Sequence, residues 1–312
     1  MSSLLITLLG PTATGKTALA AEVAYRLDGE IVSADSRQVF RGMDLGTGKD
    51  LADYDLHGTH IPYHLIDICS PLEEYSAYRF LNDFKRAYEE ITARGRQPIL
   101  CGGTGLYIDA VVRGYRLSDA PVDPAYRATL EPLSDTELTA RLAAYGPLHN
   151  HTDTETRERL VRALEIQDYA STHPDSYTRL PAMRHIVFGM QLERQLVIGR
   201  IETRLRRRLD EGMTDEVQRL LDEGIPAGRL MRFGLEYRHV TRFLTGQCSE
   251  EEMFRDLFTD IRRFAKRQMT WFRRMERNGV HIHWLDASLP ATTLADEVAT
   301  LVITNNGDRP NT

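Results

Sequence analysis

The chain has 312 residues, of which 42% are hydrophobic and 27% are charged, and its net charge at pH 7 is −6. This composition is ordinary for a globular protein of about two domains and argues against a fibrous or disordered chain. The apolar run near the N-terminus is too short to span a membrane and lacks a basic region before it, so we expect no signal peptide, no membrane partner and a cytoplasmic protein. Three isolated cysteines predict neither a disulfide framework nor a zinc site.

A phosphate-binding loop is predicted close to the N-terminus, between an apolar strand at 4–9 and a helix-like segment. The stretch matches GxxxxGK[ST] and consists of Gly10, Pro11, Thr12, Ala13, Thr14, Gly15, Lys16 and Thr17. In this context backbone N–H groups surround phosphate oxygens, the lysine neutralises them, and the hydroxyl of Thr17 can hold a magnesium ion. A glycine-rich turn without a ligand is the alternative.

Strands and helices alternate over the first hundred or so residues. Further strands are expected at 30–34, 64–68 and 98–101, and a helix is expected from Ser76 to about Arg94. This alternation predicts an α/β fold with a parallel sheet, in which ligands collect outside the carboxyl ends of the strands. Lys16, Asp35 and Thr104 all lie at such ends.

Three polar residues after these strands are candidates for chemistry. A carboxylate at Asp35 would lie near the phosphate site and could accept a proton, although an aspartate that caps a turn through Ser36 explains it equally well. Asp67 could be an outer-shell magnesium ligand. Thr104 is flanked by glycines and could approach a substrate closely, or it could belong to a simple tight turn.

A helical insertion is predicted within the α/β core. The strand pattern stops at about Gly114, a capping box at 134–137 begins one helix, and a second helix is expected from about Thr156. We therefore expect a first part of the core at 1–114, a helical insertion domain at 115–183, the remainder of the core with basic helices at 184–304, and a disordered tail at 305–312. A strand at His185–Leu192 resumes the core, and a last strand is expected at 280–285.

Two helices in the last third of the chain combine an apolar stripe with many arginines. Residues 184–279 contain 20 Lys and Arg against 15 Asp and Glu, a local +5 that leaves −11 for the rest of the chain. The helix at 196–211 carries Arg200, Arg204, Arg207 and Arg208 beside its apolar stripe, and the helix at 255–274 carries Arg262, Arg263, Lys266, Arg267, Arg273 and Arg274. Contact with a polyanion and an ordinary solvated face explain these residues equally well.

Seven sequence blocks carry a resemblance to a known family. They are GPTATGKT at 10–17, SADSRQVF at 33–40, RGMDLGTGK at 41–49, HLIDI at 64–68, GGTGLY at 102–107, RALE at 162–165 and AKRQMTWFR at 265–273. In this order they resemble the tRNA dimethylallyltransferase (tRNA isopentenyltransferase) family over nearly the whole chain to about Asp286. The GGTGLY and AKRQMTWFR blocks are more specific to that family than a P-loop is.

The resemblance implies transfer of a dimethylallyl group from dimethylallyl diphosphate to N6 of the adenosine 3′-adjacent to the anticodon in tRNA, with release of diphosphate. The P-loop would hold the diphosphate together with Mg²⁺, and Arg204 would assist it. Asp35 would be the general base on the adenine amine, and Thr104 would hydrogen-bond the target base. These roles agree with the chemistry, because a departing diphosphate needs cations and a neutral amine must lose a proton.

The resemblance also implies a tRNA-binding surface. Its residues are Asp35, Ser36, Arg37, Gln38, Thr104, Arg127, Arg159, Arg162, Arg232 and Gly234. The target adenine must leave its stack to reach the pocket, and the inserted helices would clamp the anticodon loop around it. A monomer is expected.

The chain departs from the family pattern in two segments. A His-Pro-Asn-Asp stretch is replaced by residues 153–156, with Glu158 at a position where glutamine is usual, and a Gly-Tyr-Arg pattern is replaced by Gly234-Leu235-Glu236-Tyr237. These departures bear on the choice of tRNA rather than on the chemistry. The alternatives are an adenine-nucleotide prenyltransferase, an ATP-dependent small-molecule kinase and a non-catalytic RNA-binding module.

Overall fold

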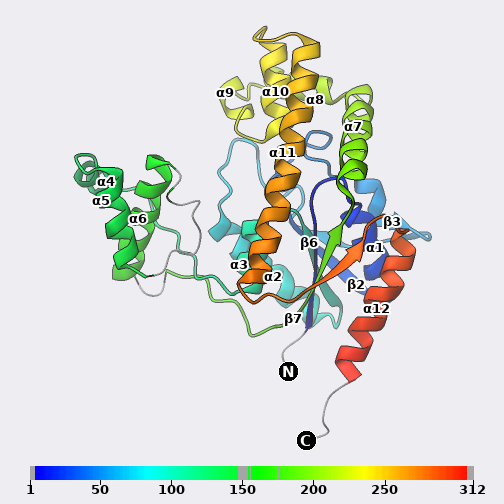
Figure 1. Ribbon diagram of the computed structural model, residues 1–312. Coiled ribbons are helices and arrows are strands. Elements are labelled where there is room, and N and C mark those ends of the chain that lie inside the picture. The colour runs from blue at the N-terminus through cyan, green and yellow to red at the C-terminus, as the bar shows by residue number, and fades with distance from the viewer. Residues whose placement is uncertain (1–3, 147–153, 155, 174–175, 308–312) are drawn as a thin grey trace, which may run out of the picture.

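The computed structural model describes residues 4–146, 154, 156–173 and 176–307 (Figure 1). Within them, six strands form one sheet in the order β5-β2-β6-β1-β7-β8, and every neighbouring pair is parallel. The strands are β1 (Leu4–Leu9), β2 (Gly29–Ala34), β5 (Tyr63–His64), β6 (Gln97–Gly102), β7 (Arg184–Gln191) and β8 (Ile282–Asp286). The predicted α/β fold with a parallel sheet is confirmed.

The strand predicted at 64–68 is wrong beyond its first residue. Only Tyr63 and His64 pair with β2, and the chain then takes left-handed backbone conformations at Leu65 (φ 63°) and Asp67 (φ 56°). The misleading pattern has a physical cause, because Leu65 and Ile66 are buried in clusters on opposite faces of the sheet, as successive residues of a strand are. A small hairpin of β3 (Asp55–Leu56) and β4 (Thr59–His60) precedes this segment, after the 3-10 helix η1 (Leu51–Tyr54).

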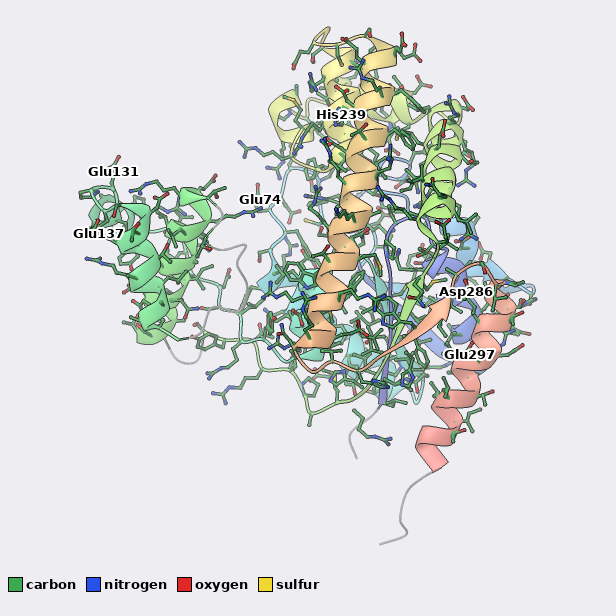
Figure 2. All side chains as sticks on the ribbon, viewed as in Figure 1. Glu74, Glu131, Glu137, His239, Asp286 and Glu297 are labelled. Carbon is green, nitrogen blue, oxygen red and sulfur yellow. The ribbon has the colours of Figure 1, made fainter. Side chains whose placement is uncertain are left out.

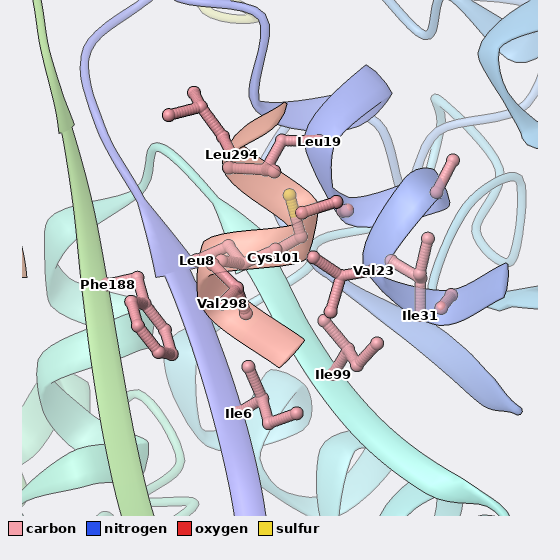
Figure 3. Close-up of a cluster of buried hydrophobic side chains, with 14 of the residues drawn as sticks. Ile6, Leu8, Leu19, Val23, Ile31, Ile99, Cys101, Phe188, Leu294 and Val298 are labelled. Atoms are coloured by element: carbon pink, nitrogen blue, oxygen red, sulfur yellow. The ribbon is translucent and has the colours of Figure 1, made fainter. Parts of the chain in front are cut away.

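Helices cover both faces of the sheet. On one face, α1 (Lys16–Leu27) and α12 (Ala291–Gly307) pack over Ile6 and Leu8 (Figure 3). On the other, α2 (Ala77–Ala93), α3 (Gly105–Val112) and the end of α11 (Glu250–Arg277) pack over Leu5 and Leu9. Ser76 caps α2 by accepting a hydrogen bond from the Arg79 backbone N–H, as its sequence predicted.

Helix α12 was absent from the predicted elements. Its Leu294 and Val298, four residues apart, fill the core beside α1. The disordered tail predicted from Asn305 is therefore wrong for residues 305–307, which continue this helix, whereas residues 308–312 lie outside the described part of the chain.

A helical lobe stands above the carboxyl edge of the sheet (Figure 1). It consists of α7 (Arg194–Asp210), α8 (Met213–Asp222), α9 (Ala227–Leu230), α10 (Leu235–Leu244) and the first half of α11. Its core includes Ile201 and Leu205 from α7 and Leu257 and Ile261 from α11, which the apolar stripes of the sequence identified correctly. Helix α11 runs from the top of this lobe down to the sheet, so one helix connects both parts.

A second helical group lies to the left of the sheet in Figure 1 and comprises α4 (Pro124–Leu130), α5 (Asp135–Ala144) and α6 (Arg157–Thr172). These helices pack around their own cluster of leucines, which includes Leu130, Leu138 and Leu164. The capping box of Ser134 and Glu137 at the start of α5 is confirmed. Glu131 and Glu137 lie on the side away from the sheet (Figure 2). In the described residues, no helix is both long and apolar enough to cross a membrane.

Candidate active site

The P-loop joins β1 to α1 at the carboxyl edge of the sheet. Left-handed backbone at Ala13 (φ 63°) and Gly15 (φ 83°) turns the chain, and the Thr14 hydroxyl donates to the Pro11 carbonyl at 2.8 Å. The Lys16 ammonium donates to the same carbonyl at 2.7 Å. Burial is the main cause that lowers the pKa of Lys16, to about 8, and Arg204 acts in the same direction. The lysine is therefore an ammonium that an anion would stabilise.

A cleft of about 1540 Å³ opens between the P-loop, the ends of β2 and β6, and helices α7 and α11. The predicted site residues in its lining are Thr12, Ala13, Gly15, Lys16, Thr17, Asp35, Ser36, Arg37, Gln38, Thr104, Arg159, Arg204, Arg232 and Gly234. Gly10, Pro11 and Thr14 form the loop behind this lining. Most of the predicted residues thus lie around one cavity, as expected for the carboxyl edge of a parallel sheet.

The turn after β2 joins Asp35 to Thr104. Asp35 Oδ1 accepts a hydrogen bond from the Arg37 backbone N–H at 2.9 Å, so the aspartate does close a turn. Thr104 Oγ1 accepts one from the Ser36 backbone N–H at 3.0 Å, and the Thr104 N–H donates to the Ala34 carbonyl at 3.1 Å. Both residues also line the cleft, so the structural and the chemical interpretations are compatible here.

A glutamine on α11 connects the P-loop with the glycine-rich loop after β6. Gln268 is 7% exposed, its Oε1 accepts from the Thr12 backbone N–H at 2.9 Å, and its Nε2 donates to the Gly103 carbonyl at 2.9 Å. A Cβ atom at Gly103 would lie 2.5 Å from that Nε2, so only glycine permits this approach. Gln268 lies within the AKRQMTWFR block, but the sequence pattern alone predicts no role for it.

Helix α7 presents its arginines to the cleft. All four of its predicted basic-face residues, Arg200, Arg204, Arg207 and Arg208, line the cavity. Arg204 Nη1 donates to the Thr12 hydroxyl at 3.2 Å, and its Nη2 donates to Asp50 Oδ2 at 2.6 Å. Burial lowers the pKa of Arg208. The face that sequence left undecided between solvent and a polyanion therefore points into the site.

The loop that carries Asp50 is held rigidly by charged side chains. Glu216 accepts backbone hydrogen bonds from Asp44 and Leu45 at 2.8 Å each. The buried Lys49 ammonium donates to the Phe40 carbonyl at 2.7 Å and forms ion pairs with Asp44 and Asp67. Asp67, considered a magnesium ligand, thus pairs with Lys49 and lies outside the lining of the cleft.

The basic face of α11 is only partly directed at the cleft. Arg267, Arg274 and Arg277 line it, whereas the Arg262 guanidinium lies over the Phe258 ring, 5.3 Å from its centroid. Phe264 belongs to the apolar stripe of the helix predicted at 255–274, but its ring is 39% exposed and lines the cavity, so this residue does not join the buried core. Trp271, which is also part of this apolar stripe, lines the cavity beside Gly105.

The three predicted tRNA-binding arginines of the inserted helices have different surroundings. Arg159 on α6 lines the cleft, but Arg127 and Arg162 both bind Glu165, which is 2% exposed, at 2.8 and 2.6 Å. Burial opposes ionisation of Glu165, yet the hydrogen bonds from the two arginines and a backbone N–H outweigh it and lower its pKa to about 2. Asp153 and Glu155, part of the first departure from the family pattern, lie outside the described residues.

The second departure, at 234–237, separates into two environments. Gly234 (φ 136°) and Glu236 line the cleft, and burial raises the pKa of Glu236. Tyr237 is buried, and its hydroxyl donates to Glu216 Oε1 at 2.6 Å, which ties it to the Asp44–Gly46 loop. The tyrosine therefore supports the loop, and its neighbours face the cavity.

Comparisons with known proteins show the family of the chain. The sequence model of the IPP transferase family matches residues 38–275. A tRNA dimethylallyltransferase 1 of Porphyromonas gingivalis is 54% identical over 301 residues, which cover 96% of this chain and 100% of the relative. A tRNA dimethylallyltransferase 2 of Syntrophotalea carbinolica is 52% identical, covering 92% of this chain and 96% of that one.

A solved structure agrees as well. The full-length tRNA isopentenylpyrophosphate transferase of Bacillus halodurans superposes with a TM-score of 0.70 at 32% identity, and the match covers 97% of this chain and 96% of that one. The family model matches most of the length of this chain, and the relatives are similar over nearly all of it. The chain therefore belongs to the tRNA dimethylallyltransferase family.

Proposed function

We propose that this protein transfers the dimethylallyl group of dimethylallyl diphosphate to N6 of the adenosine 3′-adjacent to the anticodon in tRNA, and releases diphosphate. One observation carries the proposal: a single cleft brings together the P-loop, Asp35, Thr104 and the arginines of α7. Family membership supports the same reaction. A cytoplasmic location follows from a tRNA substrate and is proposed with it.

The donor diphosphate would lie on the P-loop, with Lys16 and Arg204 beside it. The C–O bond between the allylic carbon and the diphosphate breaks, and its electron pair leaves with the diphosphate. Negative charge accumulates on the leaving group, so cations that are already in place stabilise the transition state. Arg204 is held in position by the Thr12 hydroxyl at 3.2 Å, which keeps its guanidinium next to the loop.

The acceptor adenine would enter the cleft from the side opposite the donor diphosphate, with its amine between Asp35 and Thr104. The N6 nitrogen forms the new bond to the allylic carbon, and its proton passes to the Asp35 carboxylate. The hydrogen bond from Arg37 N–H to Asp35 Oδ1 fixes the carboxylate and leaves Oδ2 for the proton. The adenine must first leave its stack, and Phe264 offers an exposed ring in the same cavity on which a base can stack.

A magnesium ion fits the residues at the P-loop. Thr17 lines the cleft next to Lys16, and its hydroxyl is an oxygen ligand of the kind that magnesium prefers. In the described residues, no group of three or more His, Cys, Asp or Glu side chains could hold a metal ion alone. Thr17 would therefore share the ion with diphosphate oxygens. When bound, Mg²⁺ would neutralise charge on the leaving diphosphate.

The decisive test is incubation with labelled dimethylallyl diphosphate, Mg²⁺ and unmodified tRNA, followed by nucleoside analysis. We expect labelled N6-dimethylallyladenosine, equimolar diphosphate and no consumption of ATP. Conversion of ATP to ADP would favour the kinase, and label on free adenine nucleotides alone would favour the nucleotide prenyltransferase. Binding of tRNA without turnover of either compound would indicate an RNA-binding module.

A further inference from the structure

Asp50 lies at the centre of the arginine cluster that faces the P-loop. We propose that Asp50 occupies this cluster as an internal anion, is displaced from the arginines by the donor diphosphate, and thereby limits diphosphate affinity and promotes product release. This inference rests on the proposed function, because it takes the diphosphate as the ligand of the cluster.

Asp50 contacts three arginines that lie within about one turn of α7, Arg204, Arg207 and Arg208. Oδ2 accepts from Arg204 Nη2 at 2.6 Å, and Oδ1 lies 3.4 Å from Arg208 Nη2 and 3.7 Å from Arg207 Nη2. The same Arg204 guanidinium reaches the Thr12 hydroxyl of the P-loop with its other nitrogen. Arg204 thus lies between an aspartate and the phosphate loop, with one nitrogen for each.

The backbone before Asp50 is shaped for this contact. A Cβ atom at Gly48 would lie 2.0 Å from Arg208 Nη2 and 2.6 Å from Arg204 Nη2, so the absence of a side chain lets both guanidiniums approach the loop. Gln38 holds the Gly48 carbonyl at 3.0 Å, and the buried Lys49 anchors the next residue. The loop therefore holds one carboxylate beside the arginines.

The arginines can exchange this carboxylate for a stronger anion. Asp50 is 28% exposed and lines the same cleft, so water can solvate it once the arginines turn away. A diphosphate carries more charge than a carboxylate and presents several oxygens to the same guanidinium forks. Binding would transfer Arg204 from Asp50 to the diphosphate, and departure of diphosphate would be favoured because Asp50 takes the arginine back.

The alternative role is purely structural: Asp50 holds Arg204 in place and assists binding. The two roles predict opposite changes in diphosphate affinity when the charge of Asp50 is removed. Without an internal competitor, diphosphate binds more tightly and leaves more slowly; without a holder, Arg204 loses its position and diphosphate binds more weakly. The sign of one measured change therefore decides between them.

The test is calorimetric titration of inorganic pyrophosphate with Mg²⁺ into the full chain and into Asp50→Asn. We expect about 5- to 20-fold tighter binding in Asp50→Asn, from the loss of one like charge within a few ångströms of the ligand. Asp50→Ser should show the same direction, and Asp50→Glu, which keeps the charge, should bind as the unmodified protein does. Equal or weaker binding in both neutral variants would overturn the proposal, as would tighter binding in Asp50→Glu.

Asp53 supplies a matched control. It lies in the same 3-10 turn and lines the same cleft, but the pairing with α7 is made by Asp50. Asp53→Asn should change pyrophosphate affinity by less than about twofold, because among the described residues Asp53 forms no ion pair with α7 and interacts with Arg204 and Arg207 only through space. An effect as large as that of Asp50→Asn would mean that the total charge of the cleft, not displacement of Asp50, sets the affinity, and would also overturn the proposal.

Steady-state kinetics of prenylation test the role of Asp50 independently of the titration. In Asp50→Asn the KM for dimethylallyl diphosphate should fall, and added pyrophosphate should inhibit more strongly. Because the titration uses neither tRNA nor an allylic group, its failure is distinguishable from failure of the proposed function. Prenylation with unaltered pyrophosphate affinity in Asp50→Asn would refute only the role of Asp50, whereas pyrophosphate binding without prenylation would refute the proposed reaction.

Discussion

The arginines of the cleft and those of the inserted helices are held by carboxylates in opposite ways. Arg204 in the cleft binds Asp50, which is partly exposed and lies beside a cavity. Arg127 and Arg162 on the inserted helices surround Glu165, which is almost completely buried. Arg204 can exchange Asp50 for a ligand. The pairing at Glu165 cannot be broken without leaving a buried carboxylate without its partners. An arginine in a sequence therefore says little about function until the burial of its partner is known.

The largest expected effect lies at the edge of the sheet. Asp35→Asn should lower kcat for tRNA prenylation by about 10²- to 10⁴-fold, because the amide keeps the turn but cannot accept the N6 proton. Binding of dimethylallyl diphosphate, measured by calorimetry, should be unchanged. Full activity in Asp35→Asn would remove this residue from the chemistry and leave it as a turn residue only.

The next effect tests the buried pairing. Glu165→Gln should destabilise the group of α4, α5 and α6 by about 3 kcal/mol, because two guanidiniums lose their shared anion. Hydrogen exchange of these helices is the measurement, and pyrophosphate affinity in the cleft should stay the same. Protection that matches the unmodified protein would show that the pairing contributes nothing to this part of the fold.

Acid should weaken the same pairing. The pKa of Glu165 is lowered to about 2 in the folded protein, so its stabilisation is present above the unfolded value of about 4.3 and is lost as the pH falls toward 2. In Glu165→Gln this part of the pH dependence should disappear. An identical acid profile in the variant would assign the loss to other carboxylates.

A smaller effect concerns Lys16, whose pKa is about 8 in the absence of donor. A diphosphate favours the charged ammonium, so donor affinity should be full below pH 8 and fall by about tenfold per pH unit above it, until the pKa of the complex is reached. Calorimetry of the donor between pH 6.5 and 9.5 measures the slope. Lys16→Arg remains charged and should give a flat profile, and an equal slope in that variant would locate the titration elsewhere.

The smallest effect compares two arginines on one helix. Arg267→Gln should weaken tRNA binding a few-fold and reduce the salt slope by about 1, because this residue lines the cleft. Arg262→Gln should leave the slope unchanged, because Arg262 lies outside the lining of the cleft. Equal slopes in the two variants would mean that the tRNA does not distinguish the cleft face of α11 from its outer face.

Sequence patterns predicted the parallel sheet and the P-loop because both depend on local signals, namely apolar strands and a glycine-rich loop before a helix. They placed Asp35 and Thr104 correctly because strand ends meet at one edge. They failed at 64–68, where Leu65 and Ile66 reach two different cores as successive residues of a strand do, although left-handed backbone at Leu65 and Asp67 interrupts the strand. The role of Gln268 could not be predicted, because its two hydrogen-bond partners are 256 and 165 residues away along the chain and no spacing in the sequence indicates them.

The role of Gln268 depends on its being an amide. Each of its two hydrogen bonds uses a different end of the side chain, as the Thr12 N–H requires an acceptor and the Gly103 carbonyl requires a donor. Glutamate can only accept when ionised and lysine can only donate, so each could satisfy one loop and would leave the other without a partner. Since α11 extends for 28 residues from the upper lobe, a displacement of that lobe would shift both loops together. The P-loop and the glycine-rich loop after β6 are thereby kept in register by a single side chain.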